Sequence, residues 1–408
     1  MKRWRDKALE STAALLEAYT SGRSGPWQLA YSGGKDSTVT AAQTLRMLLL
    51  LKPDQRDRPI YITSADTGID LTTYPTKLAE FKRMERIIKQ YDLPVEIAEV
   101  RAPVKDNMIF LILGLGYPLP DKRSQWCTER MKVVPQRRFF TEVKPVMTLL
   151  GVRASETVAR GESVKKFSIS KYFGENNTMM PIVDFTLDDV WSYLAIDKTP
   201  WGDAEDISAL YKEATGECGL RKRKAGAGEK VDDPCGARFG CIICPMVTID
   251  KSTRQISRTR PWYEPYADLR DIIIEMYKDP KNRAGYRRDG AIMFYGEGTF
   301  NIQARRELFA IFMQAQEDNK LLASLHGVEP QPILTEELIS AIQQQWKDDE
   351  RDTPYLAEAP EIGLLYETRP RGIRGNADQV LGQITANYEA DGDIDAWISS
   401  GQSTKRGS

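Results

Sequence analysis

The chain has 408 residues, 41% of them hydrophobic, and carries 57 basic and 58 acidic side chains. This length predicts two or three domains with ample apolar material for a core. The near-zero net charge excludes binding of nucleic acid through bulk charge, although it is compatible with local basic patches. A single histidine, His326, nearly excludes histidine-based hydrolytic triads and multi-histidine metal sites.

The sequence gives no sign of a membrane or secreted protein. No apolar run approaches the roughly 20 residues that a membrane helix needs. The charged segment 1–10 also lacks the apolar centre of a signal peptide. We therefore expect a cytoplasmic protein without membrane contact, in which clustered cysteines indicate metal binding rather than disulfides.

Strand-like and helix-like segments alternate through the first half of the chain. This pattern predicts an α/β fold, a parallel β-sheet with helices on both faces, whose ligands bind at the carboxyl ends of the strands. The expected elements in chain order are a helix at Asp6–Ser21, a strand at Trp27–Tyr31, a helix ending near Leu51, a strand at Pro59–Ser64, a helix at Lys77–Tyr91, and strands at Val95–Val100 and Val146–Val152.

The second half differs in composition. The Thr186–Asp189 segment has the pattern of a capping box and predicts a helix at Leu187–Leu194. Further along, helix-like segments dominate at Tyr266–Tyr277, Ala304–Gln316 and Glu336–Trp346. We predict an α/β domain at 1–205, a cysteine-rich insert at 206–260, a mainly helical domain at 261–400 and a disordered tail at 401–408.

A glycine-containing hexapeptide follows the first expected strand and opens a helix. It reads Ser32-Gly33-Gly34-Lys35-Asp36-Ser37. Glycines let backbone amides approach an anion, and the helix N-terminus and Lys35 add positive charge. A Walker loop requires glycine at position 29, which is leucine, so that class of phosphate loop is excluded.

The hexapeptide resembles the PP-loop of the ATP pyrophosphatase superfamily, also called adenine nucleotide α-hydrolases, which cleave ATP between the α and β phosphates. Other segments are similar to the phosphoadenylyl-sulfate (PAPS) reductase branch of that superfamily. They are Asp66-Thr67-Gly68, Gly151-Val152-Arg153 with Glu156 and Arg160, Trp126-Cys127-Thr128, and Pro181-Ile182 followed by Val190-Trp191.

These resemblances imply that ATP and Mg²⁺ bind at the loop. Lys35, Asp36, Arg153 and Cys127 are then the expected catalytic residues. Asp36 would be the carboxylate for Mg²⁺, although a carboxylate there could equally cap the helix. Cys127 is either a buried residue of the sheet domain or a thiol that relays sulfur. The expected nucleotide-binding residues are Ser32, Gly33, Gly34, Lys35, Asp36, Ser37, Asp66, Thr67, Gly68, Arg153, Glu156 and Arg160.

Four cysteines crowd into the insert as Cys218, Cys235, Cys241 and Cys244, with Pro245 after the last. Thiolates three residues apart can point at one centre, and two more complete a four-sulfur site. The spacing favours a 4Fe–4S cluster over zinc, because the paired symmetry of a zinc ribbon is absent.

The same insert resembles that of the DndC-type and SspD-type sulfurtransferases of bacterial DNA phosphorothioation, as do Gly296–Phe300, Arg305 and Arg306 after it. This resemblance implies a 4Fe–4S cluster and an enzyme that adenylates a DNA backbone phosphate so that sulfur can replace a nonbridging oxygen. It also implies three kinds of partner: DNA, a cysteine desulfurase as sulfur donor, and further subunits of the modification system, an ATPase and a nickase.

Basic runs around the insert are either solvated loops or a DNA-binding surface. They are Arg221–Lys224, Lys251–Arg260 and Tyr286–Arg288. Two other functions stay open: a different PP-loop enzyme (PAPS reductase, sulfurylase-type or tRNA-thiolating), and a non-catalytic iron–sulfur scaffold of a DNA-modification complex. True PAPS reductases use a cysteine near their C-terminus, and this sequence has none after Cys244.

Overall fold

The computed structural model describes residues 3–121, 124–156, 158–175, 177–215, 239, 241–246, 249–291, 293 and 296–352. The chain divides into two compact units. The first combines Met1–Ala102, Thr128–Ile242 and Ile249–Tyr263, and the second combines Pro103–Cys127, Ile243–Thr248 and Glu264–Ser408. Residues 103–127, which the sequence analysis places within 1–205, thus belong to the second unit. The predicted boundaries at 205, 260 and 400 stay predictions, and the expected tail at 401–408 lies outside the described residues.

A six-stranded sheet forms the centre of the first unit, in the order β3-β2-β1-β4-β6-β5. All neighbouring strands are parallel except the short pair β5 and β6, which is antiparallel. The predicted mainly parallel sheet is confirmed. In that spatial order the strands are β3 (Val95–Arg101), β2 (Ile60–Asp66), β1 (Trp27–Ala30), β4 (Met147–Leu150), β6 (Thr178–Met179) and β5 (Phe173–Gly174).

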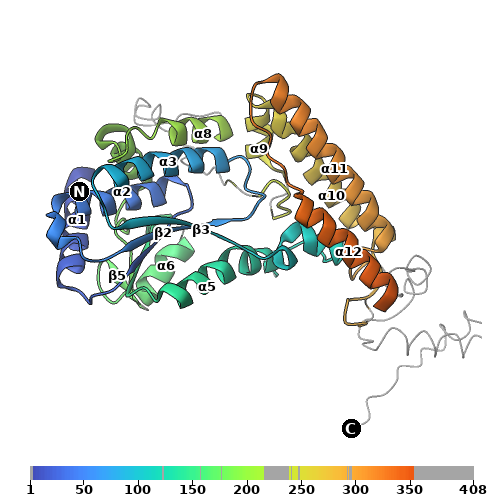
Figure 1. The fold of residues 1–408 in the computed structure, drawn as a ribbon, viewed down its shortest axis with the longest axis horizontal. Helices are drawn as coiled ribbons and strands as arrows, with labels where there is room; N and C mark the ends of the chain where they lie inside the picture. Colours follow the sequence, from blue (N-terminus) through green and yellow to red (C-terminus); the bar gives the residue numbers. More distant parts are fainter. Residues whose placement is uncertain are drawn as a thin grey trace, which may run out of the picture. The chain divides into compact units, whose positions relative to one another are not determined.

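Helices cover both faces of this sheet, as predicted. Figure 1 shows α2, α3 and α8 on one side and α5 and α6 on the other. The helices of the first unit are α1 (Trp4–Ser21), α2 (Lys35–Leu50), α3 (Tyr74–Gln90), α5 (Val134–Val143), α6 (Val158–Phe167), α7 (Leu187–Ser192), α8 (Glu205–Thr215) and α9 (Lys251–Ser257), with short turns η1 (Pro53–Gln55), η4 (Glu129–Val133), η5 (Tyr193–Asp197) and η7 (Pro261–Tyr263).

Burial explains why the central strands read as apolar runs. Strands covered on both faces lose the alternation of polar and apolar residues. Leu29 of β1, Ile62 of β2 and Leu149 of β4 are at most 1% exposed. The core continues into α2, where buried threonines satisfy their hydroxyls locally: Thr40 donates to the carbonyl of Asp36 at 3.1 Å.

The boundaries of the expected elements match closely. In the first unit the largest difference is at α3, which begins at Tyr74 rather than at Lys77, because Pro75 occupies its first turn, where a missing amide costs nothing. In the second unit two helices run past their predicted ends: α11 (Ile302–Leu325) continues beyond Gln316, and α12 (Glu336–Asp352) continues beyond Trp346. The predicted capping box is present: Thr186 accepts from the amide of Asp189, and Asp189 accepts from that of Thr186.

The second unit is mainly helical, as expected for the C-terminal region. Its long helices are α10 (Glu264–Lys278), α11 (Ile302–Leu325) and α12 (Glu336–Asp352). Its short helical turns are η2 (Val104–Asp106), the π-helix η3 (Phe110–Gly114), α4 (Trp126–Thr128), which continues into the first unit, and η8 (Pro280–Asn282).

A buried ion-pair cluster joins these helices. Asp349 accepts from Arg305 at 2.8 Å and from Arg288 at 2.7 Å. Arg305 also donates to the carbonyl of Gly114, and Trp346 donates to that of Leu113 at 2.8 Å, so both satisfy the end of the π-helix. No helix in the described part of the chain is long and apolar enough to span a membrane.

Candidate active site

The phosphate loop lies where the order of strands changes direction. From β1 the chain proceeds to β2 on one side and later to β4 on the other. Loops at the carboxyl ends of two such strands diverge and leave a crevice, the usual ligand site of this architecture. Here the two loops touch: a Cβ on Gly151, after β4, would lie 3.0 Å from the backbone nitrogen of Ser37.

The loop itself is held by its own hydroxyl groups. The hydroxyls of Ser32 and Ser37 are 3.1 Å apart, and Ser37 donates to the carbonyl of Gly34 at 3.0 Å. Gly33 has φ +77°, a conformation that favours glycine. Gly34 caps helix α2 in extended geometry without a side-chain bond.

The first amides of α2 are therefore available to an anion. Those of Lys35, Asp36 and Ser37 have no carbonyl partner in the described part of the chain. Such a row of donors at the start of a helix is an anion receptor. The segment Ser32–Ser37 thus has the geometry of an anion receptor, and its binding of a nucleotide stays a prediction.

Asp36 organises the positive charge beside this receptor. One of its carboxylate oxygens lies 2.6 Å from Nε of Arg153, and the other lies 3.0 Å from Nζ of Lys35. Arg153 is only 4% exposed. Asp36 sits in the first turn of α2 after the cap, so the helix-cap alternative is wrong. Both oxygens are thus engaged by cations, and the role of Asp36 as a carboxylate for Mg²⁺ stays a prediction.

An aromatic wall borders the same lysine, and the sequence analysis missed it. The Nζ atom of Lys35 lies 5.0 Å from the ring centre of Tyr211, in α8. Tyr211 in turn packs edge-on against Trp191 and Phe239, with ring centres 5.2 and 4.7 Å apart. Rings excluding water around Lys35 strengthen its attraction for a phosphate.

The Asp66–Gly68 loop forms a second turn at the same edge of the sheet. Asp66 accepts from the amide of Gly68 at 2.9 Å and pairs with Arg101 of the neighbouring strand at 2.7 Å. Gly68 has φ +70°, and Thr67 is 3% exposed. The two predicted loops thus share one edge, with Asp66 already neutralised by a cation.

Lys77 and Glu99 link this edge to the phosphate loop, and nothing in the sequence pattern singled them out. Nζ of Lys77 lies 3.0 Å from Oε1 of Glu99, and the Lys77 side chain is 7% exposed. A Cβ on Gly33 would lie 3.1 Å from Cβ of Lys77. Tyr74 donates to Glu99 at 3.4 Å, and burial, together with the nearby carboxylates of Asp66 and Glu99, raises the Tyr74 pKa.

One predicted metal ligand lies next to the second loop. The Cys241 thiol donates to Asp70 at 3.3 Å, and Lys132 lies 3.4 Å from the other oxygen of Asp70. The amide of Ile242 also donates to the carbonyl of Ile69 at 2.9 Å. The end of the cysteine-rich insert is therefore anchored beside Asp66–Asp70.

The remaining predicted residues are not brought together in the described structure. Cys218 and Cys235 lie outside the described residues, as does the side chain of Arg160. Glu156 is exposed. Cys127 is a half-buried free thiol in the second unit rather than a buried residue of the sheet domain. In the described part of the chain no three potential ligands converge on a metal site.

A profile of the family described as "Phosphoadenosine phosphosulfate reductase domain" matches residues 26–245. The match covers more than half of the chain, including both loops, Arg153 and the cysteine-rich insert. The chain belongs to this family. Family membership agrees with the observed sheet and with the predicted PAPS reductase-like domain, and it does not distinguish the DNA-modifying branch.

One curated protein with a similar sequence is "Uncharacterized protein MJ0066" of Methanocaldococcus jannaschii, which is 28% identical over 231 residues. The alignment covers 56% of this chain and 38% of that protein, so the chain spans well under half of the relative's length.

Solved structures that match part of the chain include PAPS reductase from Candida auris in a phosphate complex, at 14% identity, 48% coverage of this chain, 84% coverage of that chain and a TM-score of 0.30. Another is U34-tRNA thiolase NcsA from Methanococcus maripaludis with its [4Fe-4S] cluster. It is 12% identical, the match covers 66% of this chain and 80% of that chain, and the TM-score is 0.29. A third is FMN adenylyltransferase from Candida glabrata. It is 14% identical, the match covers 63% of this chain and 73% of that chain, and the TM-score is 0.32. At these TM-scores the likeness says nothing about substrate or cofactor.

Proposed function

We propose that this protein is an adenylating ATP pyrophosphatase and sulfurtransferase that acts on a DNA backbone phosphate. The observation that carries the proposal is the anion receptor at the start of α2, with Lys35 and Arg153 beside it at the point where the strand order changes. Family membership supports a nucleotide substrate. The DNA acceptor rests on the resemblance of the cysteine-rich insert to the phosphorothioation enzymes.

In the first step the terminal phosphates of ATP bind the loop amides at the start of α2. A nonbridging oxygen of the DNA phosphate attacks the α-phosphorus, and the bond from that phosphorus to the bridging oxygen breaks. Pyrophosphate leaves with the electron pair. Lys35 and Arg153 offset the developing negative charge, because this chemistry depends more on positioned cations than on a proton relay.

In the second step hydrosulfide, or a sulfur donor at the same oxidation state, attacks the phosphorus of the adenylated DNA phosphate. The new bond joins phosphorus to sulfur, AMP leaves with one former phosphate oxygen, and a proton goes to solvent. The sum is ATP, hydrosulfide and a phosphodiester giving AMP, pyrophosphate and a phosphorothioate, with no net oxidation. A sulfur relay through Cys127 stays a prediction.

The implied 4Fe–4S cluster fits the two predicted ligands that the structure describes. Cys241 and Cys244 are half-buried thiols outside any disulfide and three residues apart in the sequence, which is the donor chemistry that such a cluster needs. Cys218 and Cys235 would complete the set. When bound, such a cluster supplies a centre for handling sulfur or electrons next to the Asp66–Asp70 loop. No step above uses the cluster or Mg²⁺.

Acceptor identity tests the proposal. Purified protein is incubated with ATP, labelled sulfide and DNA, tRNA or sulfate, and pyrophosphate, AMP and sulfur incorporation are measured. We expect pyrophosphate and AMP with DNA alone, and losses of about 10²-fold or more in Lys35→Ala but not in the exposed control Lys52→Ala. Release of ADP would refute an α–β cleavage, and transfer to tRNA or sulfate would select one of the other PP-loop activities. If wild type and Lys35→Ala alike form no pyrophosphate with DNA and partner proteins present, the non-catalytic scaffold is favoured.

Anaerobic purification with iron and sulfide analysis tests the cluster. We expect iron with visible absorbance that is lost in Cys241→Ser. Stoichiometric zinc would contradict the iron–sulfur assignment.

A further inference from the structure

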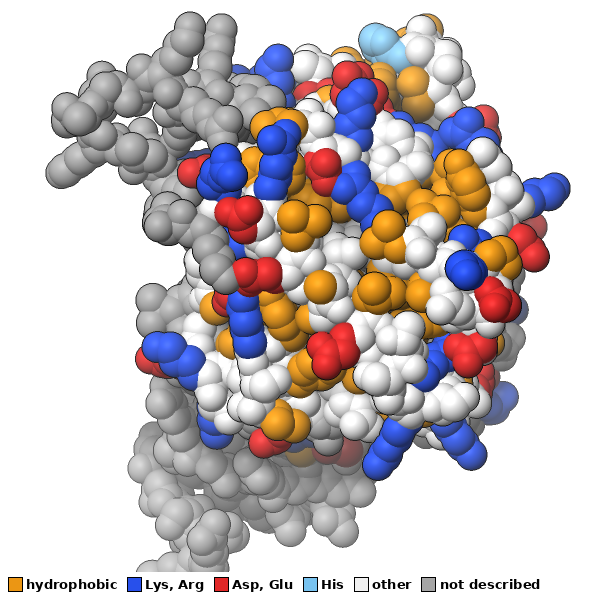
Figure 2. Space-filling model, turned by 90° about the vertical axis from the view of Figure 1, so that its left-hand side faces the viewer, with side chains coloured by type: hydrophobic (Ala, Val, Ile, Leu, Met, Phe, Trp, Pro, Cys, Tyr) orange, Lys and Arg blue, Asp and Glu red, His pale blue; other side chains and the backbone are white. Residues whose placement is uncertain are grey.

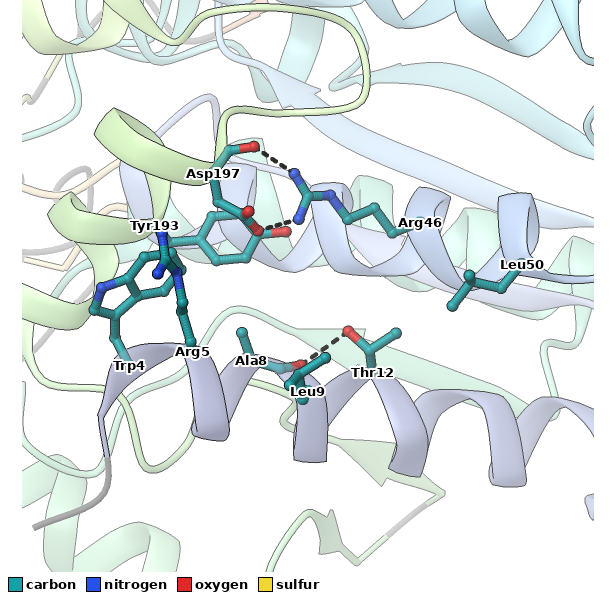
Figure 3. A pocket seen from close by; sticks show the side chains of 9 residues that line it. All are labelled: Trp4, Arg5, Ala8, Leu9, Thr12, Arg46, Leu50, Tyr193 and Asp197. Carbon is teal, nitrogen blue, oxygen red and sulfur yellow. Dashed lines mark hydrogen bonds and ion pairs between the residues drawn. The ribbon is translucent and has the colours of Figure 1, made fainter.

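A second cavity lies on the first unit, between the start of α1, the second half of α2 and the turn η5 (Figure 3). Its volume is about 280 Å³ and it is open to solvent. Arg46 on its wall lies eleven positions along α2 from Lys35, a distance of about 17 Å at the helical rise. The cavity is therefore separate from the phosphate loop, and the proposed function does not use it.

Two aromatic rings form one end of the cavity. The ring centres of Trp4 and Tyr193 are 6.1 Å apart and the rings meet edge-on. Figure 3 shows Trp4, Arg5 and Tyr193 gathered at this end and Leu50 at the other. The guanidinium carbon of Arg5 lies 5.1 Å from the ring centre of Trp4, and that of Arg46 lies 5.1 Å from the ring centre of Tyr193. Aromatic rings with stacked arginines are typical of platforms for nucleobases.

The two arginines differ in what they can still bind. Arg46 is already engaged: it pairs with the Asp197 carboxylate and donates to the carbonyls of Asp197 at 2.6 Å and Lys198 at 2.7 Å. Arg5 is exposed and pairs with no carboxylate in the described part of the chain. The cavity therefore presents one available cation at its mouth.

Tyr193 and two leucines on the cavity wall lack suitable partners among the described residues. Tyr193 is 1% exposed, yet its hydroxyl has no hydrogen-bond partner among the described residues. Burial raises its pKa, so the hydroxyl keeps its proton. Leu9 and Leu50, which line the cavity, are 71% and 70% exposed. Leaving both apolar surfaces in water and a hydroxyl unpaired is unfavourable unless something occupies the cavity.

The side of the first unit that carries α1 is shown in Figure 2. Hydrophobic side chains gather there between scattered Lys, Arg, Asp and Glu side chains. This mixed surface carries no large field of one sign. It suits an occupant whose apolar part makes most of the contact and whose charge is small.

We propose that this cavity binds one nucleotide unit, with a planar base against Trp4 and the two leucines and a phosphate at Arg5. The volume suits a single base with its sugar. A free mononucleotide and a unit of single-stranded nucleic acid share this chemistry, so the two sources are separated by experiment.

The experiment uses thymine probes, because an adenine nucleotide would also enter the phosphate-loop site. The full chain, with pyrophosphate present in excess, is titrated with a labelled eight-residue oligo(dT) and separately with thymidine 5′-monophosphate. Trp4→Ala should weaken binding about tenfold or more. Arg5→Ala should weaken it as well and, for the oligonucleotide, reduce the slope against log salt by about 0.7.

Arg3→Ala is the matched control, because Arg3 is an exposed arginine two positions away that pairs with Asp6 and does not line the cavity. It should leave both affinities unchanged. Variant-dependent binding of both probes identifies a mononucleotide site, and binding of the oligonucleotide alone identifies a strand-binding site.

Equal affinity of wild type, Trp4→Ala and Arg5→Ala would overturn the proposal. So would binding that Arg3→Ala weakens as much as Arg5→Ala does. Binding of an acidic leucine-rich peptide but of neither nucleotide probe would also overturn it, in favour of a protein partner. The proposed function is tested by pyrophosphate release and Lys35, so each can fail alone.

Discussion

The carboxylate of Asp36 accepts a 2.6 Å hydrogen bond from Nε of Arg153, which lies 117 positions further along the chain. Asp36 opens α2 after β1, whereas Arg153 follows β4. The pair therefore ties together the two loops that flank the crevice. Since Lys35 pairs with the other oxygen of Asp36, this one carboxylate holds two cations beside the free amides of the phosphate loop.

Removing the carboxylate should misplace both cations. We expect Asp36→Asn to lower kcat/KM for pyrophosphate release by about 10²-fold, and Arg153→Gln to lower it at least as much. The measurement is pyrophosphate release under single-turnover conditions. Arg137→Gln, at an exposed arginine of α5, should behave as wild type. If Asp36→Asn is as fast as wild type, Asp36 does not position Lys35 and Arg153.

Lys77 should set the affinity of the loop for phosphates without joining the reaction. Its stem packs against Gly33 and its ammonium is held by Glu99. We expect Lys77→Met to raise the dissociation constant for inorganic pyrophosphate several-fold, with partial rescue in Lys77→Arg. Calorimetric titration measures both.

Lys82→Met is the control for that change, because Lys82 is an exposed lysine on the same helix. It should leave pyrophosphate binding unaltered. If Lys77→Met lowers the melting temperature but not the pyrophosphate affinity, the residue is only structural.

Gly151 should tolerate no side chain, because its Cβ would lie 3.0 Å from the backbone of Ser37. We expect Gly151→Ala to displace the loop and to reduce pyrophosphate binding by tenfold or more. Gly202→Ala gives the contrast: it introduces a Cβ into open space at φ +123°. That change should cost about 1 kcal/mol of stability and no affinity. Equal pyrophosphate affinity in Gly151→Ala and wild type would contradict the close approach of the two loops.

The buried ion-pair cluster of Asp349 with Arg288 and Arg305 should make the stability of the protein depend on pH. Burial opposes ionisation of Asp349, but hydrogen bonds from Arg288 and Arg305 outweigh it, so its pKa lies below the ordinary value. A carboxyl with a lowered folded-state pKa contributes stability above its unfolded pKa of about 4 and loses it as the pH falls through the folded value. The melting temperature of the wild type should therefore fall when the pH is lowered below about 4.

Asp349→Asn should reduce that dependence and cost about 3–5 kcal/mol at neutral pH, because it leaves buried arginines without a counter-charge. Asp348→Asn changes the neighbouring carboxylate, which pairs with the exposed Arg351, and should cost under about 1 kcal/mol. Parallel pH profiles of wild type and Asp349→Asn would show that Asp349 is not the group responsible.

Periodicity and motif order were sufficient for the α/β class, for β1 to β4, for α1, α2, α3 and α7, and for the position of the glycine-containing loop. These depend on local chemistry: buried parallel strands are apolar throughout, and a loop that cradles an anion needs glycines and hydroxyls next to one another in the chain. The capping box at Thr186–Asp189 was predictable for the same reason. Each signal spans fewer than about twenty residues, so the chain carries it without folding.

The tertiary structure alone decided how distant residues pair. Lys77 with Glu99, Lys35 with Tyr211, and Cys241 with Asp70 join segments whose separation in sequence carries no signal of contact. The same holds for the cavity at Trp4 and Tyr193. Side-chain contacts across a sheet edge or between helices depend on strand order and on helix packing, and neither is written into local spacing. Asp36 illustrates the difference, since its position at the start of α2 was evident from sequence, whereas its pairing with Arg153 follows from β1 and β4 lying side by side.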